Sequence, residues 1–116
     1  GDGATYNPGT DGWEPLSGAN APAARFHHVA LWTGQEMLIV AGCNGSKEFA
    51  TGSAYDPLTH MWRPLSTSGN PQPRAETAAA WTGTELLVFG GLANGQPMAA
   101  FQRLIPQPVW YFYRKL

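Results

Sequence analysis

A chain of 116 residues with 43% apolar and only 13% charged residues is long enough for one domain, and its composition excludes a disordered polypeptide. The formal net charge of −1, with few and scattered Lys and Arg apart from Arg114 and Lys115, argues against nucleic acid as a partner. No apolar run approaches the roughly 20 residues that a membrane-spanning helix requires, so we expect a soluble protein without a membrane partner. Fourteen Gly and ten Pro favour a chain that reverses direction often, which is typical of an all-β fold.

Targeting and redox signals are sparse. The chain begins Gly-Asp-Gly, without an initiator Met or a charged-then-apolar signal segment, so we expect a partial or processed product and predict no compartment. Cys43 is the single cysteine, which excludes an intrachain disulfide and is too little for a metal cluster.

Strands are expected in chain order wherever a short apolar or alternating run ends in a turn residue. The expected strands cover residues 26–32, 36–41, 52–55, 61–65, 76–80 and 86–89. Gly34 and Gly83 would supply the positive φ that a tight reversal requires after the first strand of each set. Asp56-Pro57 begins the turn between the third and fourth strands, because Asp before Pro favours a turn.

The second strand of each set gives the clearest prediction about packing. Residues 37–40 and 86–89 are apolar at every position instead of alternating, so both faces of these strands need to be covered. The small residues at 76–80 predict a crowded inner position. Four indoles are expected to fill the wider outer space between sheets, where large rings stabilise most: Trp13, Trp32, Trp62 and Trp81.

The sequence repeats itself at a distance of 49 residues without a gap. Matched pairs include Tyr6 with Tyr55, Pro8 with Pro57, Trp13 with Trp62, Arg25 with Arg74, Trp32 with Trp81, Glu36 with Glu85 and Gly42 with Gly91. So many identities at one spacing exclude chance. A fixed period of this length is the sequence signature of a repeat architecture.

The repeat resembles the kelch repeat. The resemblance is carried by Leu86–Gly91, which ends in a double glycine, and by Ala54-Tyr55-Asp56-Pro57 followed by Trp62. The first copy departs from this pattern with Ala41-Gly42, and we expect this change to cost little, on the condition that the φ of Ala41 is negative. The resemblance implies four-stranded antiparallel blades of a kelch-type β-propeller.

Counted in this way, the chain holds about two and a half blades. Residues 1–19 are expected to form a half blade, residues 20–69 a full kelch blade, and residues 70–116 a degenerate terminal blade. The similarity fades after Gly91, but Leu104-Ile105-Pro106 falls where a third strand should end. The tail at 110–115 resembles the terminal strand of bacterial kelch-repeat proteins, so the chain would hold the C-terminal blades.

An open propeller of this size would expose apolar faces and strand edges at both ends, which soluble proteins avoid. Closed propellers need roughly four to eight blades. The chain is therefore expected to be a fragment of a longer propeller or a subunit of a ring, in which copies pack blade on blade or exchange strands. A ring formed by blade-on-blade packing and a ring formed by strand exchange both predict self-association through the exposed blade faces.

The resemblance also indicates where a ligand would bind. Propeller ligands usually sit over one end of the central channel, which here corresponds to the loops at 17–25, 43–51, 66–74 and 92–99. The candidate binding residues in these loops are Arg25, Asn44, Lys47, Glu48, Asn70, Gln72, Arg74, Asn94 and Gln96. The alternative is that these are ordinary polar loop residues.

Arg25 and Arg74 are the most specific of these candidates, because both repeats place an arginine at the entrance of the first strand. Such arginines could bind the carboxylates of a peptide or an acidic sugar in bidentate fashion. The alternative, which we favour, is a structural tie to carbonyls or an acid of a neighbouring blade.

Catalytic and metal signals are weak, and we predict no catalytic residue, no metal and no cofactor. His27 and His28 are adjacent on an expected strand and so point to opposite faces, which prevents joint chelation. Neither a carboxylate pair nor a Cys-His pair with His60 recurs at a catalytic spacing. Asn44-Gly45-Ser46 fits a glycosylation sequon, but Asn-Gly is first of all a turn former.

Three classes of function remain open. The first is a binding module that presents varied loops on repeated strands to a protein or a glycan. The second is a kelch-like enzyme with oxidase or sugar-modifying chemistry, for which the sequence offers only Cys43, Glu48 and the two arginines. The third is a structural unit that assembles into a ring.

Overall fold

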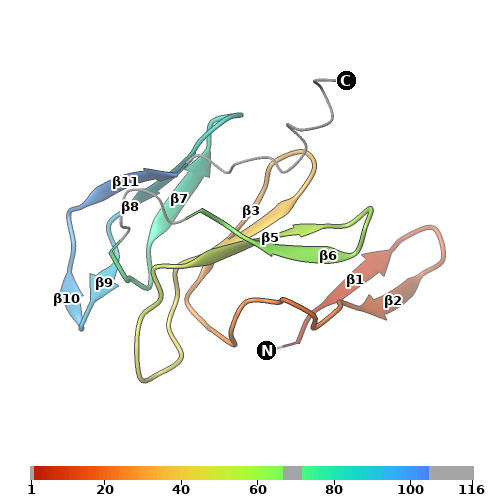
Figure 1. The fold of residues 1–116 in the computed structure, drawn as a ribbon, viewed down its shortest axis with the longest axis horizontal. Helices are drawn as coiled ribbons and strands as arrows, with labels where there is room; N and C mark the ends of the chain where they lie inside the picture. Colours follow the sequence, from red (N-terminus) through yellow and green to blue (C-terminus); the bar gives the residue numbers. More distant parts are fainter. Residues whose placement is uncertain (1, 67–71, 105–116) are drawn as a thin grey trace.

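Every regular element of the described chain is a β-strand, and these strands form antiparallel sheets (Figure 1). The computed structural model describes residues 2–66 and 72–104. Within those residues no helix could span a membrane. The all-β class that the Gly- and Pro-rich composition predicts is confirmed.

The central sheet corresponds to one complete repeat. Its four strands follow one another in space in their chain order: β3 (Val29–Trp32), β4 (Met37–Val40), β5 (Gly52–Asp56) and β6 (Met61–Pro64). Gly34 turns the chain between β3 and β4 with a φ of 102°. In the turn between β5 and β6, the Asp56 carboxylate accepts the Leu58 N–H at 2.8 Å. This sheet is the four-stranded antiparallel blade that the kelch resemblance implies.

The first strand of each repeat is shorter than expected, for a reason that lies in the backbone. His27 has a φ of 53°, and Glu76, at the same position one repeat later, also has a φ of 53°. A residue other than glycine with positive φ has left the β region, so strand pairing resumes only beyond it. β3 therefore begins at Val29, and Phe26 keeps only an isolated bridge to Cys43.

The second sheet holds three strands of the next repeat, with β8 in the middle. They are β7 (Ala78–Trp81), β8 (Leu86–Phe89) and β11 (Phe101–Leu104). β11 begins 49 residues after β5, so it is the third strand of this repeat even though the sequence similarity has faded there. A small hairpin of β9 (Leu92–Ala93) and β10 (Gln96–Pro97) connects β8 to β11. The expected final strand and the tail at 110–115 lie outside the described residues.

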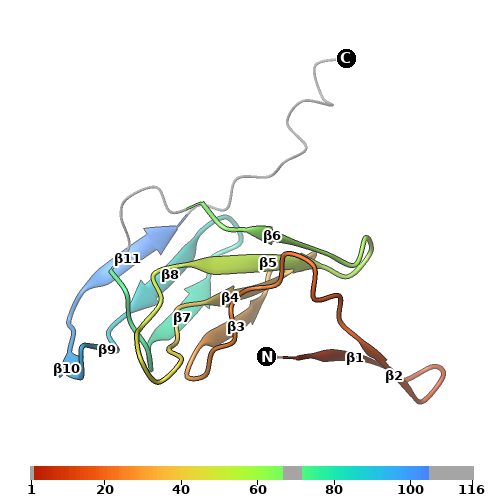
Figure 2. The same ribbon diagram turned by 60° about the horizontal axis from the view of Figure 1, so that its bottom comes forward.

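The chain opens with a separate hairpin of β1 (Ala4–Asn7) and β2 (Gly12–Pro15). These strands occupy the repeat positions of β5 and β6, and the ring of Tyr6 lies 5.1 Å from that of Trp13, as Tyr55 lies 5.0 Å from Trp62. Figure 2 shows this hairpin set apart from the two larger sheets. The described chain thus contains parts of three successive repeats.

The core lies between the two larger sheets. Leu38, Val40, Ala54 and Leu65 of the first repeat pack with Leu86 and Val88 of the second. The sheets approach most closely along β3 and β7 and diverge toward β6 and β11, as blades around an axis do (Figure 1). The fold is therefore kelch-like blades, and the ring is not closed by this chain.

The expectation that the second strand is covered on both faces holds for β4. On its other face, Ile39 packs with Tyr55 and Trp62 in a second buried cluster. β8 is covered on one face only within the described chain, since Phe89 is 54% exposed. No described sheet packs against that face.

The expectation that the indoles fill the space between sheets is wrong for two of them. Trp62 is buried as predicted, but Trp13 is 70% exposed and Trp32 is 57% exposed, because no described sheet is packed tightly against them.

The expectation about Ala41 is also wrong. Ala41 has a φ of +58°, the same left-handed conformation as Gly90 one repeat later. The condition under which we expected Ala41 to cost little is therefore not met, and this alanine carries backbone strain.

Candidate functional site

The long loops of both repeats gather at one end of the sheets. Figure 1 shows the segment that leaves β4, residues 41–51, beside the β9–β10 hairpin at the lower edge, with residues 17–28 next to them. The tight turns at 33–36 and 82–85 lie at the opposite edge (Figure 1). We call the edge formed by residues 41–51 and 92–97 the loop end.

Backbone hydrogen bonds fix the loop end to the sheets. Phe26 and Cys43 exchange hydrogen bonds of 2.8 and 2.9 Å, and Ala75 and Leu92 do the same one repeat later. The Gly42 N–H donates to the Arg74 carbonyl at 2.9 Å, which joins the two repeats directly. The loops are therefore held on a rigid support.

Arg25 and Arg74 make the same hydrogen bonds one repeat apart. Nη1 of Arg25 donates to the carbonyls of Ala41 at 3.0 Å and Thr51 at 2.9 Å. Nη1 of Arg74 donates to Gly90 at 3.2 Å and Ala100 at 2.9 Å, which are the equivalent carbonyls. These acceptors belong to the arginine's own repeat, so our expectation of a tie to a neighbouring blade is wrong. Each arginine instead ties the end of its second strand to the start of its third.

The two arginines differ in their surroundings. The guanidinium of Arg25 stacks over the Phe49 ring at 4.3 Å and remains partly exposed. Arg74 is only 1% exposed, and its Nη2 has no hydrogen-bond partner among the described residues. Burial disfavours the charged form and lowers the pKa of both side chains. Their role as ligand-binding residues stays a prediction.

The remaining candidates divide into turn formers and exposed side chains. The Asn44 side chain accepts the N–H groups of Ser46 and Lys47, both at 3.0 Å, so it shapes its own turn. Lys47 is exposed, with Nζ 5.5 Å from the Phe49 ring centre. Glu48 accepts the Asn94 N–H at 3.1 Å across a sequence distance of 46 residues. Two predicted residues from different repeats are thus brought together.

The last three predicted residues differ in where they lie. Gln72 and Gln96 are exposed, the first before the entrance of the second repeat and the second on β10. Asn70 lies outside the described residues. The loop end therefore presents mainly Lys47, Glu48 and Gln96.

A pair that the sequence analysis missed lies at the entrance of the first strands. His27 Nδ1 is 3.2 Å from Glu76 Oε1, and the Glu76 N–H donates to the His27 carbonyl at 3.1 Å. The Phe26 ring meets the His27 ring edge-on at 4.9 Å. The 49-residue shift relates positions 27 and 76 and could have revealed the pair, but we considered His27 only with its neighbour His28.

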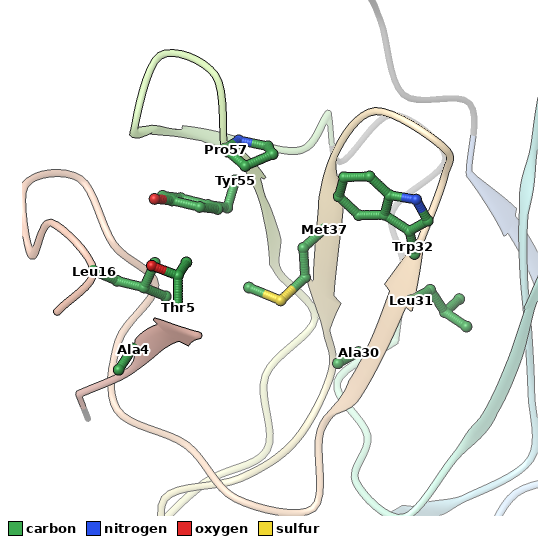
Figure 3. A pocket seen from close by; sticks show the side chains of 9 residues that line it. All are labelled: Ala4, Thr5, Leu16, Ala30, Leu31, Trp32, Met37, Tyr55 and Pro57. Carbon is green, nitrogen blue, oxygen red and sulfur yellow. The ribbon is translucent and has the colours of Figure 1, made fainter. Parts of the chain in front are cut away.

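An apolar hollow of about 360 Å³ separates the β1–β2 hairpin from the central sheet. Figure 3 shows its lining, with Ala4, Thr5 and Leu16 on one side and Met37, Tyr55 and Pro57 on the other. Trp32 borders the hollow and is more than half exposed. The hollow lies between blade positions and away from the loop end.

The described residues offer little for chemistry. Nowhere among them do three side chains of His, Cys, Asp or Glu gather as metal ligands. A hydrogen bond to Asp11 raises the pKa of Tyr6, and the Leu58 N–H lowers the pKa of Asp56. Both groups lie in or beside strand turns far from the loop end, so these shifts point to turn structure rather than to an active site.

Comparison with known proteins agrees with this architecture. A family model for the Kelch motif matches residues 24–69, which include all four strands of the central sheet. No curated protein matches the chain.

Proposed function

We propose that this chain, in which residues 24–69 match the Kelch motif, is an interaction module of the β-propeller type that binds a protein or glycan partner at the loop end. Kelch repeats suggest a role in protein interaction rather than catalysis. The division into a half blade at 1–19, a full blade at 20–69 and a terminal blade at 70–116 belongs to this proposal.

One observation carries the proposal. The segment at 43–48 and the β9–β10 hairpin have related backbones, since Cys43 pairs with Glu48 as Leu92 pairs with Pro97. Their side chains nevertheless differ, since the position that is Lys47 in the first repeat is Gln96 in the second. A constant support with varied exposed side chains is the arrangement expected of a binding surface.

The chemistry of the loop end favours a polar partner surface. Lys47 supplies a cation, Glu48 an acid that is partly used by the Asn94 N–H, and Gln96 both a donor and an acceptor. Such mixed groups suit a protein surface or the hydroxyl groups of a glycan. Because the supporting backbone is hydrogen-bonded on both sides, little ordering entropy needs to be lost on binding.

Site-specific photo-crosslinking tests the proposal. A benzophenone amino acid is placed at Lys47 or Gln96, and as matched controls at Gln35 or Thr84, which are also exposed but lie at the opposite edge. We expect one partner to be captured from both loop-end positions and from neither control. The purified partner should then bind Lys47→Ala/Gln96→Ala at least about tenfold more weakly than Gln35→Ala/Thr84→Ala.

A partner captured equally from both edges, or equal affinities of the two double variants, would contradict a binding surface at the loop end. A glycan array probed with the labelled chain separates the two partner classes. Loss of glycan binding in the loop-end variant alone would identify a glycan partner.

Self-association is a second candidate, and the apolar hollow is the observation that favours it. The hollow and the exposed Trp32 lie where a neighbouring blade would pack, and a second copy could supply that blade face. Light scattering coupled to chromatography tests this candidate. We expect a discrete oligomer that dissociates in the Trp32→Ser variant, whereas a monomer at high concentration would exclude it.

A further inference from the structure

Arg74 is a buried cation without a carboxylate. Its side chain is 1% exposed, and its hydrogen bonds go to backbone carbonyls: Nη1 to Gly90 and Ala100, and Nε to Gln72 at 3.4 Å. Nη2 makes no hydrogen bond within the described chain and is itself buried. Carbonyl dipoles compensate part of the charge, but a buried charge normally has an ionic partner.

Among the described residues the chain supplies no such partner. All eight Asp and Glu residues lie within the described ranges, and there none of them forms an ion pair with Arg74. Three of the glutamates contact other side chains: Glu36 pairs with Arg63, Glu85 with Arg103, and Glu76 lies against the His27 imidazole. The side-chain carboxylates of the protein therefore leave the charge of Arg74 without a counter-charge.

A small cavity lies beside Arg74 and between the two large sheets. Its volume is about 20 Å³, and it is lined by Val40 and Phe49 from the first repeat and by Val88, Gln102 and Arg74 from the second. A cavity of roughly 10–15 Å³ holds one water-sized particle. The space therefore fits a single small ion or a water molecule.

We propose that this cavity binds a small monovalent anion, chloride in ordinary solution, against the Arg74 guanidinium. The anion would neutralise the buried charge and would lie between the first and second repeats, so its binding stabilises their packing. Gln102 lines the same cavity, and its side-chain amide can donate a further N–H. This inference does not depend on the proposed binding function.

A water molecule is the simpler occupant, and charge decides against it. Water would leave the net positive charge of Arg74 without a counter-charge. The twin arginine provides the comparison, since Arg25 makes equivalent hydrogen bonds but is partly exposed and stacked on Phe49. Bulk solvent already screens Arg25, so we assign no ion site to it.

Thermal unfolding in two salts gives the first test. The 116-residue chain is unfolded in sodium chloride and in sodium gluconate at equal ionic strength, because gluconate is too large for the cavity. The unfolding midpoint should be about 5 °C higher in chloride than in gluconate once chloride reaches ten times its dissociation constant, and this difference should level off at higher chloride. Arg74→Gln should abolish this difference, whereas the matched control Arg25→Gln should retain it.

Crystals soaked in bromide give a second test that does not require a folded Arg74 variant. Bromide replaces chloride, and we expect its anomalous signal in the cavity beside the Arg74 guanidinium. Equal midpoints in the two salts, a chloride effect that persists in Arg74→Gln, or water alone in the cavity after the soak would each overturn the proposal.

Discussion

Adjacent glycines of the kelch pattern should respond differently to the same substitution. A Cβ added at Gly91 would lie 2.5 Å from the Ala75 carbonyl oxygen and 3.1 Å from the Thr77 Cβ. A Cβ added at Gly90 would meet only the Met98 oxygen, at an ordinary 3.6 Å. Both glycines have positive φ, 94° and 68°, so the difference between them is mainly steric.

The magnitudes follow from these contacts. At Gly90, left-handed backbone strain costs an alanine about 1–2 kcal/mol, and the smaller entropy of the unfolded chain returns about 0.4–1 kcal/mol, which leaves a net loss of about 1 kcal/mol. At Gly91 the clash with a hydrogen-bonded backbone adds about 1–3 kcal/mol. Gly91→Ala should therefore destabilise the protein by about 3 kcal/mol, and Gly90→Ala by about 1 kcal/mol.

The first repeat offers an internal control for this reasoning. Ala41 occupies the position equivalent to Gly90 with a φ of 58°, so an alanine is already tolerated there. Gly42, equivalent to Gly91, remains a glycine, and a Cβ on it would lie 2.8 Å from the Phe26 oxygen. Gly42→Ala should accordingly behave like Gly91→Ala.

Urea unfolding followed by tryptophan fluorescence measures these differences, provided that the dependence on urea has the same slope in each variant. Equal losses for Gly90→Ala and Gly91→Ala would refute the steric argument. A loss below about 1 kcal/mol for Gly91→Ala would show that the strand at Ala75 moves aside, in disagreement with its paired backbone.

Further predictions concern an ion pair, an indole and a turn carboxylate. Arg63 donates to Glu36 at 3.0 and 2.6 Å in a half-buried bidentate pair, so a double-mutant cycle with alanine should give a coupling of about 1 kcal/mol; a value near zero would contradict it. Trp62→Phe removes the indole N–H that donates to the Ser17 carbonyl at 3.0 Å, so the free energy of unfolding in urea should fall by about 1 kcal/mol; an unchanged value would count against this hydrogen bond. The pKa of Asp56 is lowered in the folded protein, so its carboxylate adds stability above the unfolded value of about 3.9, and this is lost as the pH falls through the folded pKa. Asp56→Asn should flatten that part of the acid unfolding profile, and an unchanged profile would count against the turn hydrogen bond.

Most of the strands could be predicted from the sequence because the repeat contains each expected strand in two copies with different residues. β4 and β8 lie within the expected apolar runs, and β6 begins at Met61 as expected. β11 was harder, since its residues no longer resemble β5 and only the 49-residue spacing marks its place. The interruption at His27 was not predictable from residue type, because the chemically different Glu76 has the same positive φ at the equivalent position.

The candidate site was predicted less completely. The sequence correctly grouped Glu48 and Asn94 at one end, because the repeat places both after the second strand. It could not separate Arg25 from Arg74, which are identical in pattern but differ in exposure. It also missed the pairing of His27 with Glu76, which joins two repeats.

The sequence by itself determined the kelch repeat, the antiparallel order of the strands and the positions of the tight turns, because these depend on residues close together in the chain. Only the tertiary structure decided which of two equivalent side chains is buried, such as Arg74 against Arg25 or Trp62 against Trp13. The physical reason is that repeated residues share local geometry but differ in what packs against them. The neighbouring sheet decides whether a side chain is buried. Burial in turn sets the free-energy cost of a charge and the stabilisation that an aromatic ring provides.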